Sequence, residues 1–156
     1  MTAQAWADPV SLAPVRFSED LQETLAEDYG AREGAYLEER IGRALTRALA
    51  RAGGEVSQGA SVSIETTIVD ARPNRPTFQQ LVDEPSLDFG RSISTGGAEL
   101  VAVIRGPDGQ PLGEVRHRYF TSTLQEVHPA GTWNDADRSI NRFARRVAEE
   151  YARVAH

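Results

Sequence analysis

The chain has 156 residues, of which 17 are basic and 23 acidic, so its formal net charge is −6. This length fits one domain that buries its own hydrophobic core, and we predict a single domain over residues 1–156. The sequence pI is near 5.1, which argues against nucleic-acid binding because that function needs a basic surface to replace phosphate counterions.

The composition also excludes several kinds of chemistry. All 17 basic residues are Arg, so the chain has no phosphate-binding P-loop lysine, no Schiff-base amine and no Ser-Lys dyad. Without Cys it has no thiol nucleophile, thiolate metal site or disulfide. No segment reaches the ~20 consecutive apolar residues that span a membrane. We therefore predict a chain without a metal, a cofactor or a membrane-spanning helix.

Hydrophobic periodicity predicts the elements. Apolar residues at every third or fourth position predict helices, and alternation of apolar and polar residues predicts strands. In chain order we expect a strand over residues 10–17 broken at Pro14, a short helix over 18–29, a long helix over 37–52, a strand over 61–70, a short helix over 78–83, a hairpin of strands 98–105 and 112–123, and a long helix starting within 132–134.

This order of elements predicts an α+β two-layer sandwich, with a small mixed or antiparallel sheet of about four strands and two long helices on one face. The apolar stripes of both helices should pack against alternate residues of the strands. The expected core comprises Leu37, Ile41, Leu45, Leu49, Ile64, Ile68, Leu100, Ile140, Phe143 and Val147. We also expect Trp133 to be a buried anchor at the start of the last helix.

The connection over residues 71–97 is longer than the ~12 to 15 residues usual for a loop, which points to a function. Three arginines in it, Arg72, Arg75 and Arg91, could hold a carboxylate or phosphate ligand. The alternative is that they pair with acidic residues of the same connection. Gly96 and Gly97 could belong to an anion-binding loop, but because they open a strand we favour a bend.

The sheet face opposite the helices is the second candidate site, because it mixes charge with apolar side chains. We expect the connection to cover it partly, through Leu81, Val82, Leu87 and Phe89. The remaining groove would be edged by Arg116 and Arg118 and could accept an extended peptide or an acidic group. The alternative is that these two arginines form cross-strand salt bridges with Glu65 and Glu99.

Catalytic motifs are absent from the sequence. The three histidines are far apart and none lies at metal-ligand spacing from another ligand type. We interpret His117 as a structural imidazole that is hydrogen-bonded at the sheet. The prediction is accordingly a protein that is not an enzyme.

Two stretches carry a family resemblance. They are Ser-x-Ser-x-Gly-Gly-Ala-Glu-Leu followed by Asp-Gly-x-x-Leu-Gly-Glu-Val within residues 92–119, and Thr-Trp-Asn-Asp-Ala at 132–136, which opens a helix containing Phe143-Ala144. Together they resemble a group of uncharacterised proteobacterial lipoproteins of the cell envelope. The resemblance implies an α/β domain in the periplasm, tethered to the outer membrane by a lipidated N-terminal Cys that this chain does not contain.

The functional prediction is a non-enzymatic periplasmic domain that binds an envelope protein or glycan. It would bind no nucleic acid and would contact a membrane only through the lipid anchor; if Met1 is native, a cytoplasmic location is the alternative. The second hypothesis is a small-molecule or anion binding module that uses the 71–97 connection. A hydrolase without a recognisable motif is the third. The oligomeric state is left open.

Overall fold

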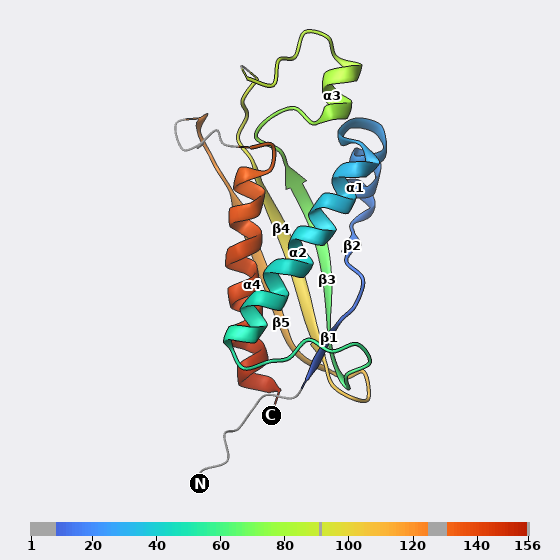
Figure 1. The fold of residues 1–156 in the computed structure, drawn as a ribbon, viewed down its shortest axis with the longest axis vertical. Coiled ribbons are helices and arrows are strands. Elements are labelled where there is room, and N and C mark those ends of the chain that lie inside the picture. Colours follow the sequence, from blue (N-terminus) through green and yellow to red (C-terminus); the bar gives the residue numbers. More distant parts are fainter. Residues whose placement is uncertain (1–8, 91, 125–130, 156) are drawn as a thin grey trace.

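A computed structural model describes residues 9–90, 92–124 and 131–155. These residues form one mixed sheet with helices packed against it (Figure 1). The elements are β1 (Val10–Leu12), β2 (Arg16–Phe17), α1 (Glu19–Thr24), the π-helix η1 (Leu25–Tyr29), α2 (Ala31–Arg51), β3 (Val62–Arg72), α3 (Phe78–Asp83), β4 (Gly97–Arg105), β5 (Pro111–Phe120) and α4 (Asn134–Val154).

The strand order in the sheet is β1-β3-β4-β5, and β2 also pairs with β3. β1 and β2 run parallel to β3, whereas β4 is antiparallel to both β3 and β5. The first predicted strand is thus two short segments on one edge, separated by residues 13–15. The predicted interruption at Pro14 is therefore confirmed. Proline breaks the strand because it cannot donate a ladder hydrogen bond, and it is tolerated there because the strand lies at an edge.

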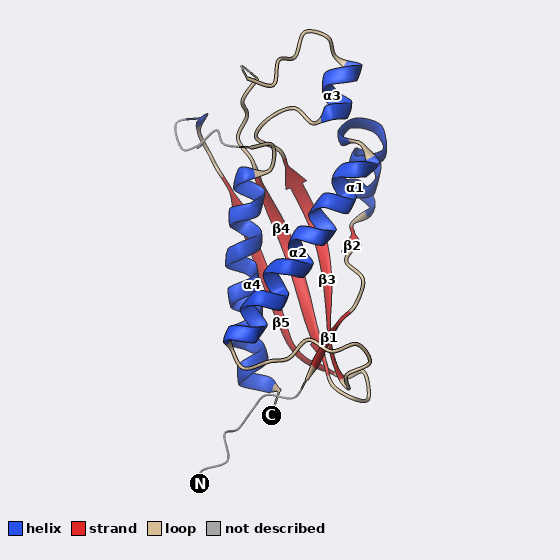
Figure 2. Ribbon diagram, in the orientation of Figure 1, coloured by secondary structure: helices blue, strands red, loops and turns tan. Residues whose placement is uncertain are grey.

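Both long helices pack on one face of the sheet (Figure 2). The α+β two-layer architecture is therefore confirmed. All the predicted core residues are at most 2% exposed, namely Leu37, Ile41, Leu45, Leu49, Ile64, Ile68, Leu100, Ile140, Phe143 and Val147. The apolar stripes of the two helices close the core from one side, as their periodicity predicts.

The 71–97 connection does not cover the open sheet face, so that prediction was wrong. β3 ends at Arg72, and the chain continues beyond the end of the sheet, where α3 packs on η1 (Figure 1). The Thr77 hydroxyl donates a 2.7 Å hydrogen bond to the carbonyl oxygen of Tyr29 and holds α3 there. Val82 and Phe89, two of the predicted covering residues, remain 59% and 44% exposed.

Trp133 joins the start of α4 to α2 and η1. Its side chain is 3% exposed, which confirms the predicted burial. The indole Nε1 donates a 3.3 Å hydrogen bond to Glu33, and the ring meets Tyr29 edge-on with 5.6 Å between centroids. Trp133 is thus an apolar anchor whose one polar atom has a partner.

Candidate functional site

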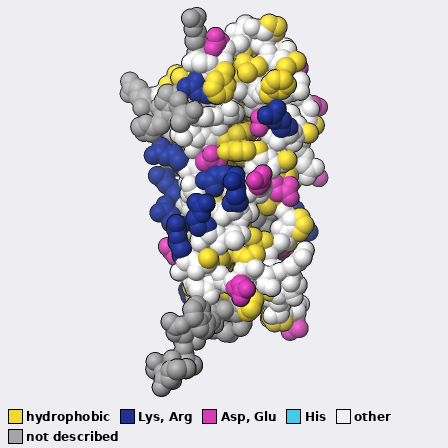
Figure 3. Space-filling view, viewed as in Figure 1, with side chains coloured by type: hydrophobic (Ala, Val, Ile, Leu, Met, Phe, Trp, Pro, Cys, Tyr) yellow, Lys and Arg dark blue, Asp and Glu magenta, His cyan; other side chains and the backbone are white. Residues whose placement is uncertain are grey.

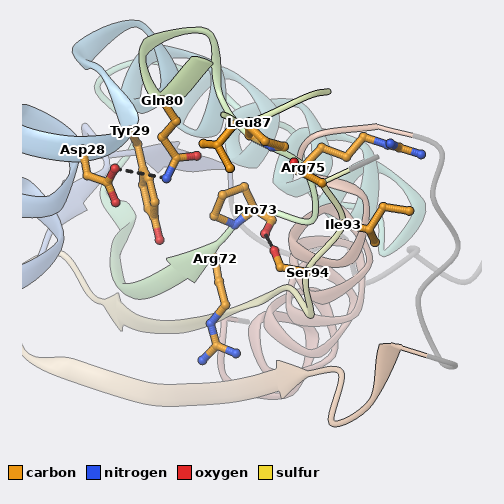
Figure 4. Close-up of a pocket in the computed structure, with 11 residues that line it drawn as sticks. Asp28, Tyr29, Arg72, Pro73, Arg75, Gln80, Leu87, Ile93 and Ser94 are labelled. Atoms are coloured by element: carbon orange, nitrogen blue, oxygen red, sulfur yellow. Dashed lines mark hydrogen bonds between the residues drawn. The ribbon is translucent and has the colours of Figure 1, made fainter. Parts of the chain in front are cut away.

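A pocket of about 340 Å³ lies at the end of the sheet where the 71–97 connection begins and returns (Figure 4). Such a volume is at the lower end of the range for small-molecule sites. The pocket is lined by η1, α3 and both arms of the connection through Asp28, Tyr29, Arg72, Pro73, Arg75, Pro76, Gln80, Leu87, Ser92, Ile93 and Ser94.

Hydrogen bonds between the lining residues hold the walls of this pocket. The Ser94 hydroxyl donates to the carbonyl oxygen of Pro73 at 2.8 Å, which ties the two arms of the connection together. The Gln80 side-chain amide donates to Asp28 at 3.1 Å and closes the α3 side (Figure 4). Burial, together with the nearby carboxylates of Asp70 and Asp28, raises the pKa of Tyr29 to about 12, so this phenol is neutral at physiological pH.

The structure places two of the three predicted connection arginines on this pocket, but their guanidinium groups point away from each other (Figure 4). Arg72 donates to the Thr95 hydroxyl at 3.3 Å, whereas Arg75 donates to the carbonyl oxygen of Phe89 at 2.6 Å. Arg91 lies outside the described residues. A bidentate clamp of Arg72 and Arg75 on one anion is not assembled in this arrangement.

A buried polar cluster beneath the pocket joins the connection to α4. Asp135 and Asn74 are 0% exposed, and Thr121 is 3% exposed. One carboxylate oxygen of Asp135 accepts hydrogen bonds from the Asn74 amide at 2.7 Å and from the Thr121 hydroxyl at 3.0 Å. The Asn74 side-chain oxygen in turn accepts from the backbone N–H of Asp135 at 2.8 Å, so a residue 61 positions away caps α4.

The sequence did not reveal this cluster. The last helix starts within residues 132–134 as predicted, but its N-cap residue, Trp133, makes no side-chain capping bond. By itself, an acidic residue in the first turn of a helix indicates only a favourable interaction with the helix dipole. No short-range pattern points from Asp135 to Asn74 or Thr121, since the three come from separate segments.

Gly96 and Gly97 are required for close packing at the start of β4. A Cβ atom on Gly97 would lie 2.1 Å from the carbonyl oxygen of Tyr119, and one on Gly96 would lie 2.9 Å from the carbonyl oxygen of Arg72. The Gly96 amide donates to the Thr121 hydroxyl at 3.0 Å. Because this N–H already has a partner within the fold, the structure supports the interpretation of these glycines as a bend and not as an anion-binding loop.

The open face of the sheet carries the other two predicted arginines. Arg116 and Arg118 each approach Glu99 at 3.7 Å, with Glu99 between them on the neighbouring strand. Glu65 pairs instead with Arg105 at 2.9 Å. The predicted alternative of cross-strand ion pairing therefore holds for Glu99 but not for Glu65.

Phe120 links the open face to the pocket. The guanidinium of Arg118 lies 4.7 Å from the centre of its ring and that of Arg72 lies 4.9 Å away. Of the five predicted site arginines, Arg72 and Arg118 are thus brought to one aromatic ring. Arg116 is linked to Arg118, but not to Arg72, through the ion pairs that both form with Glu99.

His117 faces the helices from β5 and contacts Arg146, whose guanidinium nitrogen lies 3.3 Å from the ring Nδ1. Burial lowers the pKa of His117 below its ordinary value of 6.5, and Arg146 and Arg142 lower it further. A neutral imidazole can accept the hydrogen bond from Arg146. The contact agrees with a structural role for this histidine at the sheet.

Among the described residues, no group of three or more His, Cys, Asp or Glu side chains is arranged to hold a metal ion. In the same part of the chain, no helix is both long and apolar enough to cross a membrane.

No protein-family model and no curated protein matches the sequence. Solved structures do share its fold. A hypothetical protein from Chlamydia trachomatis superposes with a TM-score of 0.55 at 10% identity, covering 94% of this chain and 99% of the other. The PelC dodecamer from Paraburkholderia phytofirmans gives 0.52 at 10% identity, with 92% and 90% covered.

A third structural neighbour is a Xanthomonas campestris protein assigned to DUF330. Its TM-score is 0.53 at 10% identity, and the match covers 94% of this chain and 86% of the other. At such identities the similarity establishes a common fold and nothing about activity.

Proposed function

We propose that this chain is a non-enzymatic domain of the bacterial cell envelope that docks onto another envelope protein through the open face of its sheet. The observation that carries the proposal is a sheet with both long helices on one side and partly exposed apolar residues on the other. Val101, Val103 and Phe120 are all partly exposed there. Such apolar positions on an open face suit contact with a partner.

The charges on this face favour a protein over an acidic polymer. Three arginines and three glutamates interleave across it, namely Arg105, Arg116, Arg118, Glu65, Glu99 and Glu114. Equal numbers of both signs produce no strong field for a polyanion. An apolar centre edged by paired charges instead resembles the core and rim of a protein interface.

Two further observations support the proposal. The segments at residues 92–119 and 132–136 resemble envelope lipoproteins, which bears on the location. PelC, which shares the fold, assembles into a dodecamer, so the fold can present surfaces for protein contacts. Separation of inner membrane, outer membrane and soluble fractions of the native cells tests the location, because recovery in the soluble cytoplasm contradicts it.

Photo-crosslinking tests the docking surface. A photoreactive amino acid at Val101 or Val103 should give one discrete adduct in native cells, whereas the same probe at Glu38, exposed on α2, should not. The protein identified in the adduct is then purified and titrated with this chain. Val103→Glu should weaken the measured affinity roughly tenfold, equivalent to about 1.4 kcal/mol.

Charge reversal separates binding from stability at the same surface. Arg116→Glu together with Arg118→Glu should weaken partner binding and lower the melting temperature slightly. If the melting temperature falls while the titrated affinity is unchanged, the two arginines serve only the sheet. Equal adducts from Glu38 and Val103 would contradict docking through the open face.

The pocket at the end of the sheet supports a second candidate, a small-molecule binding module. Its walls include Pro73, Pro76, Leu87 and Ile93, with Gln80 as a polar group. A thermal-shift screen of metabolites and envelope fragments tests it, because a ligand at 100 times its dissociation constant adds about 2.7 kcal/mol. Leu87→Trp, which would fill the pocket, should abolish such a shift; a shift that survives this substitution arises elsewhere.

A further inference from the structure

Positive charge is concentrated along two helical stretches of this acidic chain. Residues 42–53, at the end of α2, contain three arginines and no acidic residue, and residues 138–146 of α4 contain four arginines and no acidic residue. The chain as a whole has a net charge of −6. The dark blue side chains in Figure 3 gather over these parts of α2 and α4.

The two stretches face each other across a groove of about 330 Å³ between α2 and α4, which we call the arginine groove. Its floor consists of Ala44, Ala48 and Ala144, each at most 7% exposed. Its polar walls are Arg47, Arg51, Arg145 and Asn141. The three arginines are exposed, and no described residue forms an ion pair with any of them.

Interactions within the molecule do not explain this concentration of charge. Arg47 and Arg51 are one helical turn apart, and like charges at that spacing destabilise a helix slightly. The helix dipole favours a cation in the last turn of α2, but Arg145 lies in the middle of α4. The clustered arginines of the groove would therefore be stabilised most by negative charge on another molecule.

The complementary surface is on the same molecule. Residues 19–28, which form α1 and most of η1, contain five acidic residues and no basic one. We call Glu19, Asp20, Glu23, Glu27 and Asp28 the acidic ridge. All five are exposed, and within the described chain none forms an ion pair.

The arginine groove and the acidic ridge cannot meet within one molecule. α1 and η1 lie along the edge of the sheet formed by β2, whereas α4 lies over β5 at the other edge (Figure 1). Two different patches on opposite sides can join copies head to tail, and such a contact gives a closed ring or an open chain of subunits.

We propose that the acidic ridge of one copy docks against the arginine groove of a second copy. Each exposed ion pair contributes little on its own, so the contact depends on several pairs acting together. Screening shortens their range to about 10 Å at 0.1 M salt, and association should weaken as salt is added. This inference uses surfaces other than the open sheet face and stands independently of the proposed function.

Sedimentation velocity tests the proposal with two charge-reversal variants. The groove variant carries Arg47→Glu, Arg51→Glu and Arg145→Glu; the ridge variant carries Asp20→Arg, Glu23→Arg and Glu27→Arg. The unaltered chain should associate at low salt and dissociate at high salt, and each variant alone should stay monomeric. An equal mixture of the two variants contains one native ridge and one native groove, together with one reversed ridge and one reversed groove.

That mixture should regain the association that each variant alone lacks, because the acidic ridge of the groove variant meets the arginine groove of the ridge variant and the two reversed surfaces are again opposite in charge. The control carries Glu84→Arg, Asp88→Arg and Asp108→Arg, three exposed carboxylates outside the ridge, and should associate like the unaltered chain. Far-UV circular dichroism and melting temperature confirm that each variant is folded.

Three results would overturn the proposal. The unaltered chain could remain monomeric at low salt and high concentration. This result would overturn the proposal even if the groove were found to bind another polyanion, such as anionic phospholipid vesicles or dextran sulfate. The ridge variant could associate as strongly as the unaltered chain. The control could lose association as the ridge variant does, which would show an effect of net charge alone.

Discussion

The two faces of β4 differ although their residues alternate along one strand. Leu100, Ala102 and Ile104 point to the helices and are 0% exposed. Val101 and Val103 point to the open face and remain partly exposed between ion-paired neighbours. The covered face supplies the burial that stabilises the fold, while the open face leaves apolar surface for recognition.

The largest expected effect on stability comes from a substitution on the covered face. Phe143→Ala should lower the free energy of unfolding by about 3 to 5 kcal/mol, because it removes a fully buried ring and leaves a cavity. Val103→Ala on the open face is the matched control and should change it much less. Urea unfolding of both variants gives the difference, and equal losses would contradict the division into a stabilising and a recognition face.

Trp133 should show the next largest effect, since its indole is 3% exposed at the end of the covered layer. Trp133→Ala should lower the free energy of unfolding by about 3 kcal/mol. Trp133→Phe keeps most of the apolar volume but loses the bond to Glu33, so it should cost less. Thermal unfolding checks both, and an unchanged melting temperature for Trp133→Ala would refute its role as an anchor.

The buried cluster at the start of α4 should contribute less than the aromatic core. Asp135→Ala leaves the Asn74 amide and the Thr121 hydroxyl without this acceptor and should cost about 1 to 3 kcal/mol. Asp135→Asn retains one acceptor oxygen and should be milder. Chemical unfolding distinguishes them; equal losses from the two substitutions would mean that the negative charge, and not the acceptor, matters here.

Arg118 on the open face should contribute little to stability. Its side chain is 63% exposed and its contact with Glu99 is 3.7 Å long. Arg118→Gln should change the free energy of unfolding by less than about 1 kcal/mol, and less still at high salt. A loss as large as that of Asp135→Ala would show that the open face is part of the stabilising structure.

The pH dependence of His117 is the smallest expected effect. Its pKa in the folded state lies below the ordinary 6.5, so its contribution to stability is complete above pH 6.5 and is lost as pH falls through the folded-state pKa. Histidine NMR titration should therefore give a midpoint below 6.5. Arg146→Gln should raise that midpoint, and a midpoint above 6.5 in the unaltered chain would contradict the assigned surroundings.

Much of the fold follows from local patterns. The stripe that contains Leu37 and Ile41 predicts its buried helix face, because helical periodicity brings such residues to one side. The short helix expected over residues 78–83 also begins at a local capping box, in which the Thr77 hydroxyl and the Gln80 side chain each bond the other's backbone. These features depend on residues within a few positions of each other, which is why a sequence reveals them.

The candidate sites depended more on tertiary structure. The sequence correctly associated Arg72 and Arg75 with one segment, but it did not show that Arg72 turns to Phe120 on β5 while Arg75 turns to Phe89 within the connection. The connection was expected to cover the open face on the strength of its apolar residues alone. The bond from Thr77 to Tyr29 directs it beyond the sheet instead.

The sequence by itself determined the elements, the two-layer class and the core residues, since period and turn chemistry act over short distances. Only the tertiary structure decided that Asn74 caps α4, that Glu99 lies between Arg116 and Arg118, and that an arginine groove forms between α2 and α4. Each of these joins segments far apart in the chain. Their meeting depends on strand register and helix packing, which no local pattern specifies.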